Sequence, residues 1–364
     1  MIKTSDIVTD PGVVPTTWDE TDATNNATEN ILTEMNGEIL DAAKLGNALI
    51  LYSNSETWQM TADGSANVYS YRKLPFNAGA ISTNCVVEVN NRHYVFGAND
   101  IWMHDGLTME SIADKRVRKF IFKSMNAKQS GKFFTSYNPT LNTISFNFVS
   151  GDQFVSFTGS GCNRAAVYSI SNGTWTFDDT PLVFAAGYSK TSLQALTWGT
   201  VTATWETMGG SWQDLEDGFK RVMVYVGETA GPLTARVYAQ DPYEGGVLTS
   251  VVDTVATRPA LLLRDGIDLD ELDADLRGYK VILGIYPQGR LAPDAAPLTF
   301  TFGVTDYPAV PPAFGVPQTY NAREDYKLDF TDAGRFLSMK MEYPDFKTMS
   351  LSGIDIDLDM LGER

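Results

Sequence analysis

Short apolar segments alternate with polar residues along most of this chain, and clusters of Gly, Asn and Asp separate them. A period of two between turn residues is typical of β-strands with one buried face. The pattern therefore predicts an all-β fold built from short strands. In the first third of the chain the expected strands cover residues 48–52, 56–60, 86–89, 93–96 and 100–104.

The alternation is most regular near the C-terminus, in residues 354–359. Ile354, Ile356 and Leu358 predict a buried strand face, which leaves Asp355, Asp357 and Asp359 on the other face. A ladder of like charges does not stabilise a strand. It can serve as a solvated edge that discourages aggregation. The functional alternative is a surface that must not bind a polyanion.

Two tryptophans mark an internal repeat. Trp58 and Trp102 lie 44 residues apart, and each precedes an Asp-Gly turn. This spacing fits one four-stranded blade of a β-propeller. A third phrase, Gly173-Thr174-Trp175, follows after 73 residues, so the repeat is irregular. The pattern favours a propeller-like domain over a sandwich for this part of the chain.

Changes of composition divide the sequence into five expected regions. Their order is an extended polar segment, a propeller-like β domain, an inserted or appended β-sandwich, a Pro-rich linker, and C-terminal strands that return to the propeller. The boundaries are 1–30, 31–216, 217–307, 308–320 and 321–364.

One helix is expected between the strands. Ser111 and Asp114 suggest a capping box at its start. The apolar residues that share one helical face are Ile112, Val117, Phe120, Ile121 and Met125. The basic residues are Lys115, Arg116, Arg118, Lys119 and Lys123. A solvated amphipathic helix is the simpler interpretation, and a docking surface for an acidic neighbouring subunit is the functional one.

Composition limits the classes of function. The 364 residues carry a formal charge of −17, from 45 acidic and 28 basic residues, which argues against a general grip on nucleic acid. No apolar run approaches the roughly 20 residues that span a bilayer, and no signal segment begins the sequence. Cys85 and Cys162 are expected to be small buried residues. Together these features predict a soluble protein made in a reducing cytosol.

Catalytic motifs are absent from the sequence. His93 and His104 fall in expected strands, where satisfied structural histidines are the simpler interpretation. The run Asp268–Asp275 lacks the glycine and glutamate positions of a calcium loop. Accidental carboxylate pairs leave glycoside hydrolysis open. We expect no catalytic, cofactor-binding or metal site, and no enzyme activity.

Several phrases in a fixed order resemble one family, the tail nozzle proteins (tail tubular protein B) and packaged-DNA stabilisation proteins of short-tailed bacteriophages. Examples are Trp18-Asp19-Glu20-Thr21-Asp22 and Tyr137-Asn138-Pro139-Thr140-Leu141-Asn142. The matching phrases lie in residues 18–22, 36–39, 49–60, 94–106, 116–122, 137–142, 162–175, 334–338 and 351–357. Family members usually carry further N-terminal blade sequence, so the number of blades stays open.

The resemblance implies a structural virion protein made in the host cytoplasm. Such a subunit assembles, most often as a hexamer, into a ring beneath the portal and adaptor rings. The ring closes or extends the DNA exit channel, contacts tail fibres or spikes, and lets genomic DNA pass without sequence-specific binding. On this view Asp355, Asp357 and Asp359 add to an acidic channel wall.

Two other interpretations stay open. Tryptophans and tyrosines with paired carboxylates also suit a carbohydrate-binding or glycan-cleaving propeller. A sandwich in residues 219–306 also suits an adhesin of a phage tail.

Overall fold

A computed structural model describes two compact units, one N-terminal and one C-terminal. The first contains the described residues up to 239, and the second contains those from 260 onward. The described residues are 1–8, 13–22, 24–63, 68–152, 159, 161–192, 219–228, 235–239, 260–267, 278–291, 295–307, 310–344 and 349–360. Antiparallel sheets make up both units, so the predicted all-β class is confirmed.

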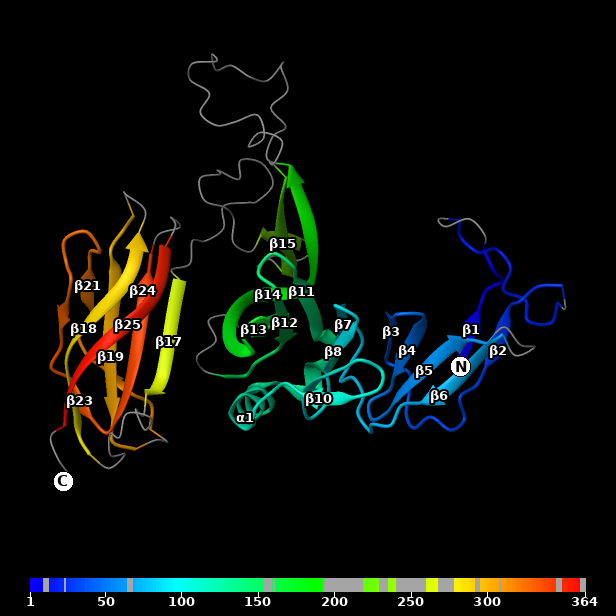
Figure 1. Cartoon of the computed structure of the whole chain (residues 1–364), viewed down its shortest axis with the longest axis horizontal. Helices are drawn as coiled ribbons and strands as arrows, with labels where there is room; N and C mark the ends of the chain where they lie inside the picture. Colours follow the sequence, from blue (N-terminus) through cyan, green and yellow to red (C-terminus); the bar gives the residue numbers. More distant parts are fainter. Residues whose placement is uncertain are drawn as a thin grey trace, which may run out of the picture. The chain divides into compact units, whose positions relative to one another are not determined.

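The first unit contains three consecutive antiparallel sheets (Figure 1). The first is β3 (Asp41–Leu45), β4 (Ala48–Tyr52), β5 (Thr57–Ala62) and β6 (Tyr69–Lys73). The second is β7 (Val86–Val89), β8 (Arg92–Phe96), β9 (Ile101–His104) and β10 (Met109–Ser111). The third is β11 (Phe134–Asn138), β12 (Thr143–Phe148), β13 (Cys162–Ser169), β14 (Thr174–Ser192), β15 (Phe219–Glu228) and β16 (Ala235–Ala239). Helix α1 (Lys115–Ser124) and the 3-10 helix η1 (Ala127–Lys132) join the second and third sheets.

The 44-residue repeat is a structural repeat of the first two sheets. Trp58 pairs with Leu51, and Trp102 pairs with Val95, so both tryptophans occupy the same place in the third strand of their sheet. The turn before that strand also recurs, because the Ser53 and Gly97 amides each donate to the carbonyl three residues on, at 2.9 Å in both cases. The first strands of the sheets also lie together, with β7 beside both β3 and β11. In a propeller the first strands of successive blades lie next to one another around the central channel. The described residues show this neighbour relation, and a closed propeller stays a prediction.

Aromatic side chains between the sheets form the main core of the first unit. Trp102 of the second sheet contacts Tyr52 of the first sheet and Phe76 of the connection that follows β6, with ring centroids 6.3 and 5.6 Å apart. Phe96 contacts Phe146 of the third sheet at 5.8 Å. These side chains are all at least nine-tenths buried. Each buried aromatic ring contributes roughly 1.5–3 kcal/mol through removal of apolar area from water, so the sheets stabilise one another.

The N-terminal segment covers the outer face of the first sheet. β1 (Ile2–Thr4) pairs with β2 (Thr28–Asn30), and Ile2, Leu32 and Met35 pack on a small cluster around Trp58. Trp102 packs on the preceding sheet from the equivalent position. The segment therefore occupies the place that a preceding sheet would take in a longer array.

The second unit is a β-sandwich. One sheet contains β17 (Ala260–Ile267), β24 (Phe336–Tyr343), β19 (Leu298–Thr305), β20 (Ala313–Phe314) and β21 (Gln318–Tyr320). The other contains β22 (Leu328–Asp329), β18 (Lys280–Leu291), β23 (Ala333–Gly334) and β25 (Met349–Met360). Both sheets contribute to one core, which includes Ile285 of β18, Phe300 and Phe302 of β19, and Met339 of β24.

The structure differs from the predicted domain boundaries at three places. β15 and β16, assigned to the sandwich, extend the third sheet of the first unit, because β14 pairs with β15 from Val183–Gly227 to Ser192–Phe219. The expected linker 308–320 contains β20 and β21, which pair with β19. The C-terminal strands do not return to the first unit: β24 pairs with β17 and β19, and β25 pairs with β18. Long-range pairing of this kind leaves no mark in local composition.

The separate cores predict separate losses of stability. Phe302 is fully buried and contacts Phe330 edge-on at 4.8 Å, so Phe302→Ala should cost about 3–5 kcal/mol. Hydrogen-exchange mass spectrometry should show lost protection in residues 260–344 and unchanged protection in residues 41–192. Phe314→Ala is the matched control, because Phe314 is 40% exposed. Equal loss of protection in both units would show that they unfold as one.

Candidate functional site

Helix α1 holds the predicted docking residues. The Asp114 carboxylate caps the helix by accepting the Val117 amide at 2.7 Å, while Ser111 lies in β10 and its hydroxyl donates to the Ala113 carbonyl. The N-cap is therefore Asp114 alone, and the predicted capping box with Ser111 is wrong. Ile121 is fully buried and fixes which helical face points inward.

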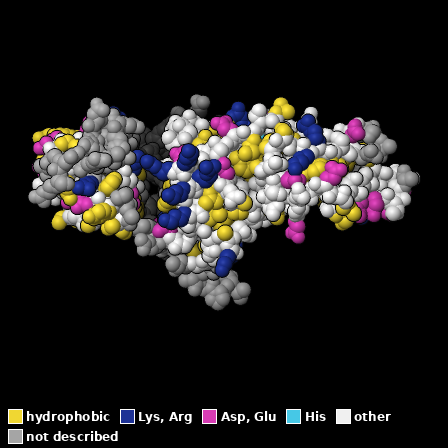
Figure 2. Space-filling view, turned by 90° about the horizontal axis from the view of Figure 1, so that it is seen from below, with side chains coloured by type: hydrophobic (Ala, Val, Ile, Leu, Met, Phe, Trp, Pro, Cys, Tyr) yellow, Lys and Arg dark blue, Asp and Glu magenta, His cyan; other side chains and the backbone are white. Residues whose placement is uncertain are grey.

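Four of the five basic residues lie exposed on the helix: Lys115, Arg116, Lys119 and Lys123. Figure 2 shows Lys and Arg side chains gathered on the face where α1 lies in Figure 1. Arg118 is different, because its guanidinium forms an ion pair with Asp100 at 3.2 Å and stabilises the contact with the second sheet. The predicted patch therefore contains four exposed cations that form no ion pair with another described residue, and one structural arginine.

An exposed aromatic pair lies within the same surface. Phe120 was predicted on the buried face, yet it is 39% exposed and packs against Phe177 of β14 with the rings tilted and their centroids 4.5 Å apart. Arg164 lies over the Phe120 ring at 5.5 Å. The reason is tertiary: β14 passes beside α1 and offers a second ring. The sequence could show that Phe120 neighbours the cations, but not that Phe177 joins it. We call Lys115, Arg116, Lys119, Lys123, Phe120 and Phe177 the basic–aromatic surface.

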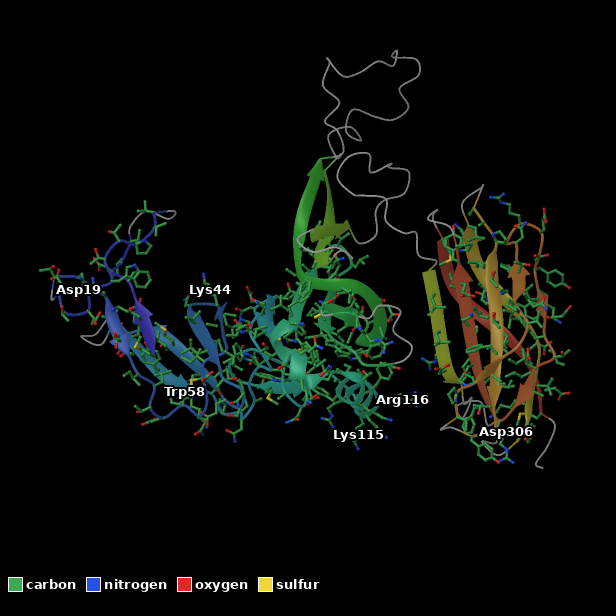
Figure 3. All side chains as sticks on the ribbon, turned by 180° about the vertical axis from the view of Figure 1, so that it is seen from behind. Asp19, Lys44, Trp58, Lys115, Arg116 and Asp306 are labelled. Carbon is green, nitrogen blue, oxygen red and sulfur yellow. The ribbon has the colours of Figure 1, made fainter. Side chains whose placement is uncertain are left out.

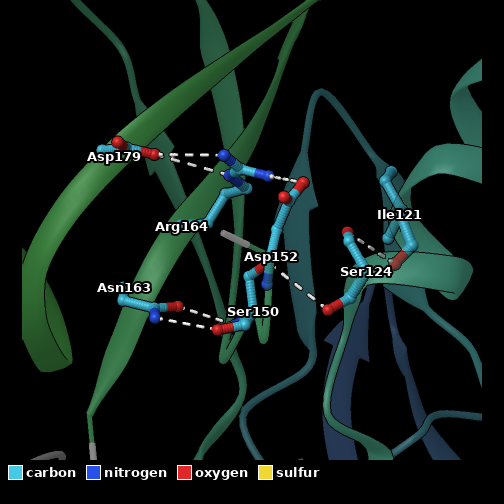
Figure 4. Close-up of polar contacts among 7 residues, drawn as sticks. All are labelled: Ile121, Ser124, Ser150, Asp152, Asn163, Arg164 and Asp179. Carbon is cyan, nitrogen blue, oxygen red and sulfur yellow. Dashed lines mark hydrogen bonds and ion pairs between the residues drawn. The ribbon is translucent and has the colours of Figure 1, made fainter. Parts of the chain in front are cut away.

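A polar network anchors this surface to the third sheet (Figure 4). Arg164 is 6% exposed and forms ion pairs with Asp152 at 3.1 Å and Asp179 at 3.4 Å. Two carboxylates compensate the buried guanidinium, which would otherwise be costly to desolvate. The side chain of neighbouring Asn163 satisfies both backbone groups of Ser150, at 2.7 and 2.9 Å.

The same network reaches the end of the helix. The Ser150 hydroxyl donates to the Ser124 carbonyl at 3.3 Å, and the Ser124 hydroxyl donates to the Ile121 carbonyl at 3.2 Å. The first of these bonds satisfies the Ser124 carbonyl, which the end of the helix leaves open, and the second adds to the bond that the Ile121 carbonyl already accepts from the Met125 amide. The basic–aromatic surface is therefore held on a rigid base.

Both histidines are buried in one hydrogen-bonded chain between the first two sheets. The Tyr52 hydroxyl lies 2.6 Å from His93 Nδ1 and 2.6 Å from His104 Nε2. His93 Nε2 lies 2.8 Å from the Lys44 carbonyl, and His104 Nδ1 accepts the Gly106 amide at 3.1 Å. The prediction that these are satisfied structural histidines is confirmed by their contacts.

The two ends of the chain determine the direction of every bond. A backbone amide donates to His104 Nδ1, so neutral His104 carries its proton on Nε2 and donates it to Tyr52. The Tyr52 hydroxyl must then donate to His93 Nδ1, and His93 Nε2 donates to the Lys44 carbonyl. Burial lowers the pKa of His104 to about 3, with the nearby His93 acting in the same direction, and burial lowers the pKa of His93 as well. Neutral rings are therefore the native form.

Both cysteines are buried and free, as the sequence predicted. The Cys162 thiol donates to the Lys132 carbonyl at 3.1 Å, and burial raises its pKa to about 12. Burial raises the pKa of the Cys85 thiol further. A thiol with a raised pKa is a poor nucleophile at neutral pH.

The acidic ladder lies on β25 of the second unit. Ile354, Ile356 and Leu358 pack against the sandwich core, so the predicted alternation is confirmed. Asp355 and Asp359 are exposed, and the Asp355 carboxylate accepts a hydrogen bond from Gln288 at 2.7 Å. Whether the ladder faces a channel stays a prediction.

Other sites add little. A shallow pocket of about 150 Å³ opens at the hairpin tips of the first two sheets, beside Gly46, Arg72, Asp105 and Leu107. This volume is below the roughly 300 Å³ of typical small-molecule sites. Among the described residues, no group of three or more His, Cys, Asp and Glu could hold a metal ion. The acidic run Asp268–Asp275 lies outside the described residues.

Comparison with known proteins gives no family assignment. No protein-family model matches this chain, and no curated protein sequence is significantly similar to it. Nor is any helix in the described part of the chain long and apolar enough to cross a lipid bilayer.

The buried histidine chain predicts a large cost for a small change. Tyr52→Phe removes one oxygen, which leaves His93 Nδ1 without a donor and His104 Nε2 without an acceptor. Each unsatisfied buried group costs about 1–3 kcal/mol, so the free energy of unfolding should fall by about 2–6 kcal/mol in urea titrations. Tyr94→Phe is the control, because Tyr94 packs in the same core and no hydrogen bond to its hydroxyl is seen among the described residues. Equal effects of the two substitutions would contradict the hydrogen-bonded chain.

The same histidines predict that the free energy of unfolding falls on acidification at pH values above those at which carboxylates take up protons. In the unfolded chain an imidazole takes a proton near pH 6.5, whereas folded His104 takes one only near pH 3. The unfolded state therefore binds more protons in this window, and stability must fall as pH falls. Between about pH 6.5 and 4.5 the slope from His104 should approach about 1.4 kcal/mol per pH unit, and His93, whose pKa burial also lowers, adds to it in the same direction. A flat free energy of unfolding across this window would show that the rings already carry charge in the fold.

Proposed function

We propose that this chain is a structural subunit of the tail of a short-tailed bacteriophage. In this proposal, six copies assemble into a nozzle ring that closes or extends the DNA exit channel below the portal and adaptor. The rim of the ring contacts tail fibres or spikes, and DNA passes through it during ejection. The resemblance of the sequence phrases is the source of this proposal, and the structure supports it at three points.

The repeat of the first two sheets is the observation that carries the proposal. The phrases around Trp58 and Trp102 occupy equivalent third strands with the same pairing register. The first strands β3, β7 and β11 lie side by side. Blade-like sheets that share an aromatic core suit a rigid wall element.

The histidines and cysteines, the side chains best suited to acid–base or nucleophilic catalysis at neutral pH, are buried in the core of the first unit. The chain has two histidines and two cysteines, and all four are buried in the contacts between sheets. The exposed features are instead charged and aromatic surfaces, which suit contacts with other subunits. This distribution supports a scaffold in preference to an enzyme.

The excess of acid supports a conduit. Each lysine or arginine on a channel wall adds affinity for DNA phosphates through counterion release, whereas carboxylates repel them. The formal charge of −17 and the exposed carboxylates of Asp355 and Asp359 are in keeping with a wall that does not hold DNA.

Particle association tests this function directly. Particles from the source culture are separated on a density gradient, and peptide mass spectrometry measures this chain in each fraction together with DNA content. We expect the chain at a fixed ratio to capsid protein in the DNA-filled fractions. If the chain is found only in the soluble fraction, the structural role is excluded and the carbohydrate-binding alternative becomes the leading one.

A further inference from the structure

Charge is strongly segregated within the first unit. Residues 1–41 contain nine acidic residues and a single lysine, whereas residues 115–132 contain seven basic residues and no acidic one. The one lysine of the acidic segment, Lys3, is already paired with Glu20 at 2.7 Å. The unit therefore has one strongly acidic and one strongly basic surface.

The acidic segment also exposes apolar side chains. Asp19, Glu20, Asp22, Glu34 and Glu38 are exposed, and Trp18 beside them is 46% exposed. Ile31 in the same segment is 67% exposed. We call these residues the acidic N-terminal surface. Exposed aromatic and aliphatic groups among like charges are typical of interaction sites.

The basic–aromatic surface matches it in both respects. Its four exposed cations are opposite in charge to the carboxylates of the acidic N-terminal surface. The Phe120–Phe177 pair could bury apolar area against Trp18 and Ile31 of another copy. Within the first unit the two surfaces lie at different ends of the row of sheets: Figure 3 labels Asp19 at one end and Lys115 and Arg116 at the other. Two complementary surfaces on different ends of one body cannot satisfy each other within that body.

We infer that the basic–aromatic surface of one copy binds the acidic N-terminal surface of a second copy. The contact is head-to-tail, so each copy keeps one free surface of each kind, and further copies add until a ring closes or a filament grows. This inference rests on the proposed assembly of copies and specifies its contact.

A second copy fits this surface better than nucleic acid does. A nucleic-acid site adds phosphate contacts over a domain with net positive charge, whereas the first unit carries a large acidic surface as well. Opposite charges steer the correct partner together and penalise like-to-like contacts. Head-to-tail pairing is the arrangement that places every basic surface against an acidic one.

A charge-swap experiment tests the inference. Variant A carries Lys115→Glu, Arg116→Glu and Lys119→Glu, so both of its surfaces are acidic. Variant B carries Glu20→Lys, Glu34→Lys and Glu38→Lys, so its acidic N-terminal surface holds three lysines against the two remaining carboxylates of Asp19 and Asp22. Neither set touches Arg118 or the Asp114 cap, and sedimentation velocity measures association of the full-length chains.

Each variant alone should self-associate at least about tenfold more weakly than the wild type. An equimolar mixture should regain association. The unchanged acidic N-terminal surface of A can bind the unchanged basic helix of B, and the glutamates introduced in A can pair with the lysines introduced in B. Raising NaCl from about 0.1 M to about 1 M shortens the Debye length from about 10 Å to about 3 Å and should weaken the wild-type contact. Lys44→Glu with Arg92→Glu is the matched control on exposed cations elsewhere in the first unit, and it should associate like the wild type.

Carbodiimide cross-linking of the wild-type chain gives a measurement without substitutions. Lys119 or Lys123 should couple to Glu34 or Glu38 between isotopically mixed copies. A mixture of A and B that associates no better than either alone would overturn the inference, as would a wild type that stays monomeric. Loss of binding to a short DNA duplex in variant A, with unchanged self-association, would assign the surface to nucleic acid instead.

The two proposals fail separately. If the chain is present in DNA-filled particles but the mixture does not associate, the function stands and this contact is wrong. If the mixture associates but the chain is absent from particles, the contact stands and the tail function is wrong.

Discussion

Each sheet of the first unit has an apolar face that only a neighbouring sheet can cover, and this requirement determines how the unit is built. Trp102 and Phe96 lie on the second sheet, yet Tyr52 comes from the first sheet, Phe76 from the connection after it, and Phe146 from the third sheet. A sheet with an apolar face must bury that face against another element. The array is therefore stable as a stack, and its first sheet is covered by the N-terminal segment.

The polar groups inside this stack follow from the same requirement. Burial removes these rings from bulk solvent, and His93, His104 and Tyr52 form hydrogen bonds with one another and with the backbone. The bonds have a single consistent direction from the Gly106 amide to the Lys44 carbonyl. This chain connects strands of both sheets and makes their packing specific as well as stable.

The surface is organised by charge. Net repulsion at −17 keeps identical chains apart unless a local surface of opposite sign is present. Helix α1 carries a local surface of opposite sign, which is the one that the proposed contact between copies uses. Buried Arg164 pairs with Asp152 and Asp179 and lies over the ring of Phe120, so the polar network of the third sheet supports this surface.

Local pattern by itself determined the strands, the helix, the 44-residue repeat and the alternation of Ile356 with Asp355 and Asp357, because each depends on residues close in sequence. It also indicated the basic residues of α1. Tertiary structure alone decided that β15 extends the third sheet, that β24 and β25 complete the sandwich, and that Phe177 joins Phe120. Those outcomes depend on hydrogen bonds and ring contacts between distant segments, whose free energy is set by the partner and not by the segment's own composition.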